Sequence, residues 1–518
     1  MNFLDFKSIK NMEFGRRSFL KNIGLASSGF FLNATFLNQL NALANVENPK
    51  KIVILGAGIA GICSAYELEQ RGHNCTILEA EPKHVGGRIR TSKMANGQTV
   101  EFGAMRLPAI HSLTMHYVNK FGLKKSKFYN SCPNGYYFLR GKKVRKKDIL
   151  SLYSEYNLTF EEQKKSPTEI WENTVGNFMA QLSEAEKKDL YATSLSFEKL
   201  IKEDKSSFLL FLQKYNLSPD AIDLLLATNA VDIEVAGGAA TEIFREEVEQ
   251  IWSKDFYQLD GGTKMLPQAF LAKMKCKPQN GCEVIGINQL NTKKVSVIYK
   301  QNNAEKMIEA DYVICTIPFP ALQNLKILPG FSTGKQRAIR ELRYDTGSKI
   351  FVQTKNRFWE KEDKIYGGAS ATDMPITKIY YPSDNVETKN PDVSNSSSVF
   401  LASYCWGAPA RNLSLLNHKE KMDIIKRQTG RIHPQLLQKG MIEDSVSWNW
   451  ADHRWSGGGY AYFLPGQQNS IQADIVKPEG RIFFAGEHCS LHHAWVQGAL
   501  ESALVSVKGI LEDIEKNG

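Results

Sequence analysis

The chain has 518 residues, of which 42% are hydrophobic and 23% charged, and its formal net charge is +10. This length exceeds what one compact core accommodates, so two or three structural units are expected, and the composition is that of an ordinary globular protein. The positive charge is spread along the chain without a long basic block, which argues against a nucleic-acid partner.

The first 44 residues have the pattern of an export signal. The arginine pair Arg16-Arg17 precedes a short, moderately apolar stretch, and the segment ALA at 42–44 fits a small-residue cleavage site. These features predict a twin-arginine signal peptide at 1–44, the export machinery as a partner, and a periplasmic or secreted mature protein. The alternative is an amphipathic helix that belongs to the fold. No run reaches the roughly 18 to 20 apolar residues that a membrane-spanning helix needs.

Residues 51–80 predict a strand, a helix and a second strand. An apolar run ends at Gly56, helical spacing follows, and the second strand ends at Glu79. Gly56, Gly58 and Gly61 open the helix, where free N–H groups and the helix dipole favour a pyrophosphate. Glu79 is placed to accept hydrogen bonds from ribose hydroxyls. The unit therefore predicts a dinucleotide site, with a purely structural glycine turn as the alternative.

The rest of the chain predicts a helical insertion between strand-rich segments. Residues 149–250 show mostly helical spacing with many charges, whereas KVSVIY, ADYVICTIP, KIFVQT and SVFLASY alternate as strands do. Residues 384–398 predict a polar surface loop, and residues 494–514 predict a closing helix.

Three segments far apart in the sequence resemble the flavin amine oxidase family. VGGRIRT places two glycines before Arg88, which can neutralise pyrophosphate charge, FFAGEH carries Glu487, and CEVIGI carries Val284. EFGAMRLP, TGSKIF, RFWE and the terminal GEH…AW further resemble L-amino acid oxidases. The resemblance implies FAD and an α/β fold, with a Rossmann-like FAD-binding domain, a mixed-sheet substrate domain and a helical insertion domain.

The resemblance also implies how these domains alternate along the chain. The FAD-binding domain takes residues 50–92, 251–340 and 471–518, the substrate domain takes 93–148 and 341–470, and the helical domain takes 149–250. The implied flavin-binding residues are Gly56, Gly58, Ile59, Ala60, Gly61, Glu79, Ala80, Gly86, Gly87, Arg88, Gly103, Ala104, Met105, Arg106, Val284, Trp450, Gly486, Glu487, Trp495, Val496 and Ala499.

Arg106 stands in the apolar segment GAMRLP, where a buried guanidinium requires an anionic partner. An internal carboxylate is one candidate. In L-amino acid oxidases the arginine of this segment binds the substrate α-carboxylate, and Tyr404 matches the tyrosine that binds the same group. Lys349 matches the lysine that holds a water near the flavin, which implies a catalytic role; an exposed lysine is the alternative. Ala494 and Trp495 match positions beside substrate and flavin, and a plain core aromatic is the alternative for both Trp495 and Trp450.

Two features depart from the family pattern or compete with it. Family members often have glycine where this chain has Ala494. His488, His492 and His493 lie close together, but a metal site needs further ligands and a flavin already accounts for this region, so no metal is predicted.

Together these features predict an exported flavoenzyme that converts an L-amino acid and O₂ to a 2-oxo acid, ammonia and hydrogen peroxide. A 2-monooxygenase of the tryptophan or lysine type, which yields an amide and CO₂, is one alternative. A catalytically silent FAD-binding envelope protein is another. The side-chain preference and the oligomeric state, including a homodimer, stay open.

Overall fold

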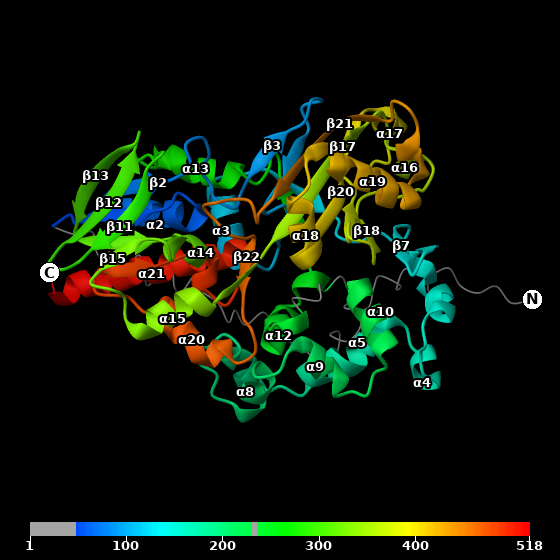
Figure 1. Ribbon diagram of the computed structural model, residues 1–518, viewed down its shortest axis with the longest axis horizontal. Helices are drawn as coiled ribbons and strands as arrows, with labels where there is room; N and C mark the ends of the chain where they lie inside the picture. The colour runs from blue at the N-terminus through cyan, green and yellow to red at the C-terminus, as the bar shows by residue number, and fades with distance from the viewer. Residues whose placement is uncertain (1–47, 230, 232–235, 292, 518) are drawn as a thin grey trace, which may run out of the picture.

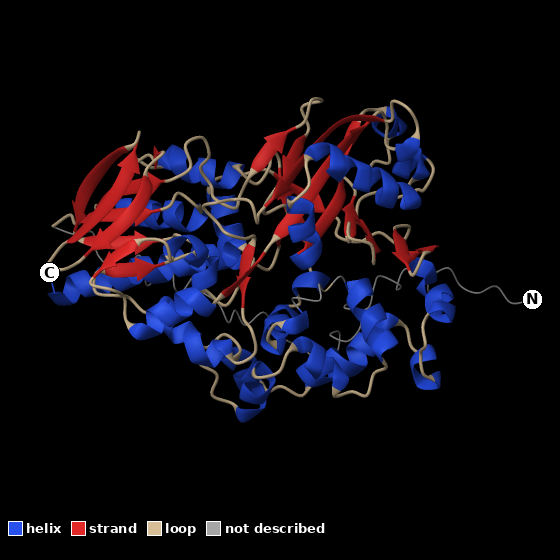
Figure 2. Ribbon diagram, viewed as in Figure 1, coloured by secondary structure: helices blue, strands red, loops and turns tan. Residues whose placement is uncertain are grey.

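The computed structural model describes residues 48–229, 231, 236–291 and 293–517. The predicted signal peptide lies outside the described residues. Two strand-rich regions stand side by side, and a mostly helical region runs along one edge of the molecule (Figures 1 and 2). Among the described residues, no helix combines the length and the apolar character needed to cross a membrane.

A parallel five-stranded sheet forms the centre of the first region. Its strands are β1 (Lys51–Leu55), β2 (Asn74–Glu79), β10 (Gln279–Asn280), β14 (Tyr312–Cys315) and β23 (Ile482–Phe484). They lie in the order β10-β2-β1-β14-β23, and every pair is parallel. Helix α2 (Ile59–Glu69) joins β1 to β2, which confirms the predicted strand-helix-strand unit.

Both faces of this sheet are covered, as its continuous apolar strands require. Ile52 and Ile54 face one core, and the alternate residues Val53 and Leu55 face the other. The first core is completed by α2, α3 (Ser112–Lys120), α13 (Met265–Lys273) and α21 (Val496–Asn517). The second is completed by β11 (Glu283–Asn288), β12 (Val295–Gln301), β13 (Ala304–Ala310), α14 (Phe319–Leu322), β15 (Lys326–Leu328), α15 (Thr333–Glu341), β16 (Arg343–Asp345), β22 (Tyr460–Tyr462) and α20 (Gln467–Val476).

A seven-stranded mixed sheet forms the second region. Its strands are β7 (Tyr136–Leu139), β8 (Lys142–Arg145), β17 (Gly347–Thr354), β18 (Ala369–Thr372), β19 (Lys378–Tyr380), β20 (Ser398–Trp406) and β21 (Ile442–Asn449). They lie in the order β21-β17-β20-β19-β18-β7-β8, with β18 and β7 parallel and the other pairs antiparallel. One face packs on α16 (Phe358–Lys361), α18 (Gly407–Ser414) and α19 (His418–Ile432).

The opposite face of this sheet turns toward two small sheets. These contain β3 (Thr91–Lys93) with β4 (Thr99–Glu101), and β5 (Leu107–Pro108) and β6 (Lys125–Phe128) on either side of β9 (Phe256–Leu259). Strand β9 thus pairs with strands from an earlier predicted domain segment. The domain limits themselves stay predictions.

The helical region has a core of its own, built around Trp171, Phe208, Phe211 and Phe244. Its helices are α4 (Phe160–Gln163), α5 (Pro167–Trp171), α6 (Asn177–Ala180), α7 (Glu184–Asp189), α8 (Glu198–Asp204), α9 (Phe208–Gln213), α10 (Pro219–Asn229) and α12 (Ala240–Glu249). Figure 1 shows this group of helices below the two strand-rich regions.

The expectation of a polar surface loop at 384–398 is wrong in part. The segment contains α17 (Pro391–Asn395), and the side chains of Asn385 and Ser394 are buried. Both donate hydrogen bonds of 2.6 Å to the carboxylate of Glu360, which is itself buried. These polar residues are needed inside because a buried carboxylate must be hydrogen-bonded.

Candidate flavin and substrate site

A cavity of about 730 Å³ is enclosed by both strand-rich regions and the helical region. Its lining includes every predicted site residue except Gly61. The predicted residues brought together there are Gly56, Gly58, Ile59, Ala60, Glu79, Ala80, Gly86, Gly87, Arg88, Gly103, Ala104, Met105, Arg106, Val284, Lys349, Tyr404, Trp450, Gly486, Glu487, Ala494, Trp495, Val496 and Ala499. Their individual roles toward a ligand stay predictions.

The first glycine turn fits a pyrophosphate. Helix α2 begins at Ile59, and its N-terminal cap, Gly58, supplies no side chain to the free N–H groups of the first turn. A Cβ on Gly58 would meet nothing within 4 Å, so a larger side chain there would project into open space beside the helix end. Gly61 has a different function, because its Cβ would lie 2.1 Å from the carbonyl oxygen of Gly56. It permits close packing of helix on strand.

A second glycine turn lies against the first. Gly86 and Gly87 have φ of +120° and +59°, values that favour glycine, and the Gly86 amide donates to the carbonyl of Ala57. A Cβ on Gly87 would lie 3.1 Å from the Cα of Gly58. Two bare backbone turns are therefore available to the same bound group.

Glu79 ends β2 at the edge of the cavity. One carboxylate oxygen accepts the amide of Ala57 and the other accepts the amide of Glu81, both at 2.7 Å. Burial raises the pKa of Glu79, and these two hydrogen bonds oppose the rise. The carboxylate is held in place, and its remaining lone pairs fit the predicted contact with ribose hydroxyls.

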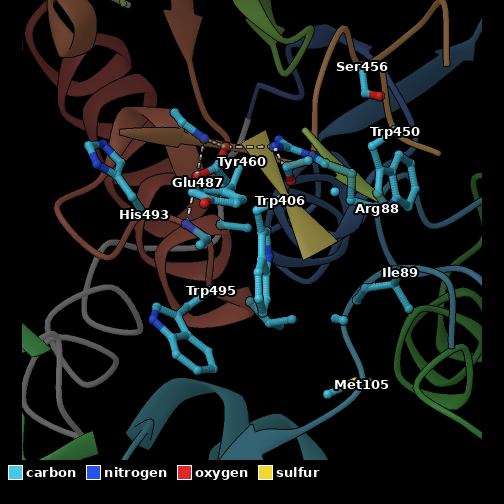
Figure 3. Close-up of a pocket in the computed structure, with 18 of the residues that line it drawn as sticks. Arg88, Ile89, Met105, Trp406, Trp450, Ser456, Tyr460, Glu487, His493 and Trp495 are labelled. Carbon is cyan, nitrogen blue, oxygen red and sulfur yellow. Dashed lines mark hydrogen bonds and ion pairs between the residues drawn. The ribbon is translucent and has the colours of Figure 1, made fainter. Parts of the chain in front are cut away.

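Arg88 and Glu487 form an ion pair at the centre of the site (Figure 3). Arg88 Nη1 lies 2.7 Å from Glu487 Oε1, although residue 487 is almost 400 positions further along the chain. The other oxygen of Glu487 accepts the amide of Ala494 at 2.9 Å. The pair joins the second glycine turn to the segment that precedes α21, a partnership that the sequence did not predict.

Three tryptophans stand around this part of the cavity: Trp406, Trp450 and Trp495 (Figure 3). The indole N–H of Trp450 donates to the carbonyl of Phe102 at 2.9 Å, and the ring covers Gly103. Trp450 therefore packs directly on the segment that leads into Arg106.

Arg106 has an aromatic setting. Its Nη1 donates to the Tyr380 hydroxyl at 2.9 Å, and its guanidinium lies 4.9 Å from the ring centroid of Trp252. Among the described residues, no carboxylate lies within ion-pair distance of Arg106. The internal carboxylate considered as an alternative is therefore absent from the described part of the chain. The guanidinium retains donors that can bind an anion in the cavity.

Lys349 is 2% exposed, so the alternative of a surface lysine is wrong. Its Nζ donates to the carbonyls of Glu101 at 2.9 Å and Gly103 at 2.6 Å, and it lies 4.6 Å from the ring centroid of Tyr404. Burial lowers the pKa of Lys349 to about 7, with Glu101 opposing the shift and Arg106 adding to it. The side chain can thus gain or release a proton near neutral pH.

The segment before α21 is fixed by carboxylates of α12. Glu246 accepts the indole N–H groups of Trp495 at 3.2 Å and Trp252 at 2.7 Å. Ala494 has a φ of +67°, a left-handed conformation that explains why glycine suits this position. Sequence reasoning missed Glu246, although Glu242, Glu246 and Glu249 have the spacing of one helix face.

Two of the three clustered histidines, His492 and His493, have carboxylate partners. His492 lies between Glu249 at 2.5 Å and Glu501 at 2.6 Å, while His493 lies 3.1 Å from Glu242. Burial acts to lower the pKa of His492, but the two carboxylates outweigh it and raise the pKa to about 10. His492 is therefore an imidazolium that neutralises buried acidic groups.

Comparisons with known proteins identify the family of this chain. A family model described as flavin containing amine oxidoreductase matches residues 59–511. The flavin-dependent L-tryptophan oxidase RebO of Lentzea aerocolonigenes is 32% identical over 89% of this chain and 98% of its own. An L-amino-acid oxidase of Daboia russelii is 32% identical over 91% of this chain and 90% of its own.

The fold also matches solved structures. Putrescine oxidase bound to putrescine superposes with a TM-score of 0.68 and 17% identity, covering 91% of this chain and 100% of that one. At this identity the match shows the shared fold. The two glycine turns, the Glu79 carboxylate and the cavity fit a flavin nucleotide, and the family match begins directly after Gly58 and includes Gly86, Gly87 and Glu79. The chain is a member of the flavin-containing amine oxidoreductase family.

Proposed function

We propose that the chain is an FAD-dependent L-amino acid oxidase that forms a 2-oxo acid, ammonia and hydrogen peroxide. The observation that carries this proposal is Arg106, which lines the cavity without a carboxylate partner among the described residues. A guanidinium in a water-poor aromatic setting binds a carboxylate in two-pronged geometry. A simple amine offers no such group, which favours amino acids as substrates.

The residues of this chain position the substrate. Arg106 is proposed to hold the α-carboxylate, and Tyr404, whose backbone pairs with Lys349 across β17 and β20, is proposed to donate a further hydrogen bond. A bound flavin supplies the two-electron acceptor for oxidation of the amine. Lys349, with its pKa near neutrality, is proposed to hold a water and to exchange its Nζ proton. Trp495 is proposed to keep the substrate in place and exclude bulk water.

The proposal is tested by anaerobic absorbance spectra of the purified flavoprotein with single L-amino acids. Some L-isomers should bleach the flavin band while their D-isomers do not. Arg106→Met should raise KM at least tenfold, and Arg106→Lys, which keeps the charge without the two-pronged geometry, should give an intermediate value. An unchanged KM in both variants would remove Arg106 from the substrate site.

Product analysis separates the oxidase from a 2-monooxygenase. One equivalent each of peroxide and 2-oxo acid supports the proposal, whereas an amide and CO₂ would refute it. Failure of every L-amino acid to bleach the flavin would favour the silent flavoprotein.

FAD is proposed as the flavin because the chain offers a place for an adenosine as well as a pyrophosphate. Glu79 suits a ribose, and Val284, on β11, lines the same end of the cavity. Heat-released flavin should increase in fluorescence on treatment with phosphodiesterase, as FAD does when cleaved to FMN. Release of FMN itself would contradict the assignment.

Export is proposed from the sequence pattern at 1–44. Replacement of both Arg16 and Arg17 by lysine should retain the full-length chain inside the cytoplasm, while the unaltered chain appears outside it in a shortened form. Export of the double variant at an unchanged level would contradict a twin-arginine signal.

A further inference from the structure

One row of residues crosses the seven-stranded sheet and forms a wall of the cavity. Lys349 lies opposite Tyr404, Tyr404 opposite Lys378, Lys378 opposite Ala371, and Ala371 opposite Tyr137. Residues directly opposite one another on adjacent strands share a face of the sheet, and all five line the cavity. With strands about 4.8 Å apart, the row extends roughly 19 Å from Lys349 to Tyr137.

Lys146 lies at the end of this row that is distant from Lys349. Lys146 lines the cavity and is only 7% exposed, and its ammonium lies 5.3 Å from the ring centroid of Tyr137. In the described part of the chain, Nζ of Lys146 has neither a hydrogen-bond acceptor nor a carboxylate partner. A buried ammonium without an anion is costly, so the position favours an anionic ligand.

Further positive charge lies between Lys146 and Arg106. Lys378 lines the cavity and lies opposite Tyr404 on the neighbouring strand. The pKa of Lys146 is lowered to about 8, chiefly because Lys146 is buried and secondly because Lys378 carries a charge of the same sign. Burial acts to raise the pKa of Tyr380, but the charges of Arg106, Lys378 and Lys146 outweigh it and bring the pKa to about 8. All three cations therefore act on the same phenol.

The described acidic residues on the α12 side of the cavity have partners of their own. Glu242 is ion-paired with Arg245 at 2.7 Å and with His493 at 3.1 Å. Glu246 accepts the indole N–H groups of Trp252 and Trp495. Both carboxylates thus have protein partners on the α12 side, whereas Lys146 projects from the sheet side.

We propose that the cavity selects L-amino acids with an anionic side chain, whose carboxylate is bound by Lys146 together with Lys378 while Arg106 holds the α-carboxylate. This inference rests on the proposed oxidase function for its amino-acid substrate. The arrangement supports it, because Lys378 lies opposite Tyr404 on the neighbouring strand, and Lys378 and Lys146 both line the cavity. L-Glutamate and L-aspartate are the substrates that fit this charge pattern.

Binding without turnover is the first test, carried out on the flavin-loaded protein. Glutarate and pentanoate have the same five carbons but differ by one carboxylate, and their dissociation constants are measured from perturbation of the flavin spectrum. Glutarate should bind at least tenfold more tightly. Lys146→Met should remove most of that preference, whereas Lys147→Met, which changes the exposed neighbouring lysine, should keep it. Equal binding of the two acids to the wild-type protein would overturn the inference without any variant.

Turnover is the second test. The kcat/KM for L-glutamate should exceed that for L-glutamine at least tenfold, and Lys146→Met should lower the first value while leaving the second within twofold. Preference for L-glutamine, L-leucine or L-tryptophan would overturn the anionic subsite and leave the oxidase function intact. Glutarate binding that depends on Lys146, with no L-amino acid reducing the flavin, would instead refute the oxidase function.

Discussion

Replacing Lys349 by methionine should increase the free energy of unfolding at neutral pH, and the increase should be smaller at high pH. The lysine pKa falls from 10.5 to about 7 on folding because the ammonium is buried. Between these values the unfolded chain binds more protons than the folded protein, so the stability of the wild type rises with pH across this window. Methionine has a similar length and no charge, and it is free of this dependence.

The magnitude follows from the pKa shift. A shift of roughly 3.5 units corresponds to about 5 kcal/mol at most, and the penalty is about 4 kcal/mol at pH 7 and about 1 kcal/mol at pH 10. The difference in unfolding free energy between Lys349→Met and the wild type should therefore shrink by about 3 kcal/mol from pH 7 to pH 10. Loss of the two hydrogen bonds to Glu101 and Gly103 adds an offset that does not change this slope.

Urea unfolding at four pH values between 7 and 10, followed by tryptophan fluorescence, measures the effect. Lys335→Met is a matched control, because Lys335 is also buried, its pKa is lowered to about 8 by burial, and it lies outside the cavity lining. Both variants should show the pH-dependent gain. Only Lys349→Met should also slow flavin reoxidation and remove a pH inflection near 7 from its rate. Parallel stability curves for Lys349→Met and the wild type would refute a buried lysine with a lowered pKa.

Further substitutions test other parts of the site. Gly58→Val should reduce flavin content at least tenfold without lowering the melting temperature of the flavin-free protein, because its side chain enters open space. Gly61→Ala should instead disturb folding, because its Cβ would lie 2.1 Å from the carbonyl oxygen of Gly56. Normal flavin binding by Gly58→Val would contradict a pyrophosphate site at the first glycine turn. Ala494→Gly should be tolerated, and Ala494→Val should lower stability by about 1–2 kcal/mol because φ is +67°, a difference that chemical denaturation resolves. The pKa of His492 is raised from 6.5 to about 10, so the stability that it contributes is complete below pH 6.5 and is lost as pH rises toward 10. The advantage of the wild type over His492→Gln should thus decrease by about 4 kcal/mol over that range, and a constant advantage would show that His492 is not held as an imidazolium.

Sequence patterns located the flavin end of the site because its contacts are local. The turn at Gly56 to Gly61 and the residue at the end of β2 lie within one strand-helix-strand unit, so their spacing alone places them together. Arg106 was noticed as a cation in an apolar segment, but its role was assigned through resemblance. Tyr404 and Lys349 were found only through resemblance, since no local pattern relates residues so far apart.

The contacts that sequence reasoning missed depend on tertiary register. Lys146 directly follows β8, as the first residue of the 3-10 helix Lys146–Glu155, and has the charge of an ordinary surface residue. It is nevertheless buried, beside Tyr137, which aligns with Ala371 across β7 and β18. Glu246 lies on a helix whose charged face is typical of solvent exposure, but that face meets Trp252 and Trp495. Burial of a charged residue follows from what packs against it, which the linear pattern does not contain.

The carboxylates of α12 hold one wall of the cavity rigid, so substrate specificity is proposed to depend on the opposite wall, which is formed by the seven-stranded sheet. Glu242, Glu246 and Glu249 share a helix face and hold His493, Trp495 and His492 respectively. A shift of α12 against this segment would break three buried polar contacts at once, each of which is strongly unfavourable to leave unpaired. The wall beside Trp495 is therefore fixed in shape. Differences in the substrate side chain are therefore proposed to be accommodated at the opposite wall, where the ammonium of Lys146, which has no carboxylate partner in the described part of the chain, lines the cavity.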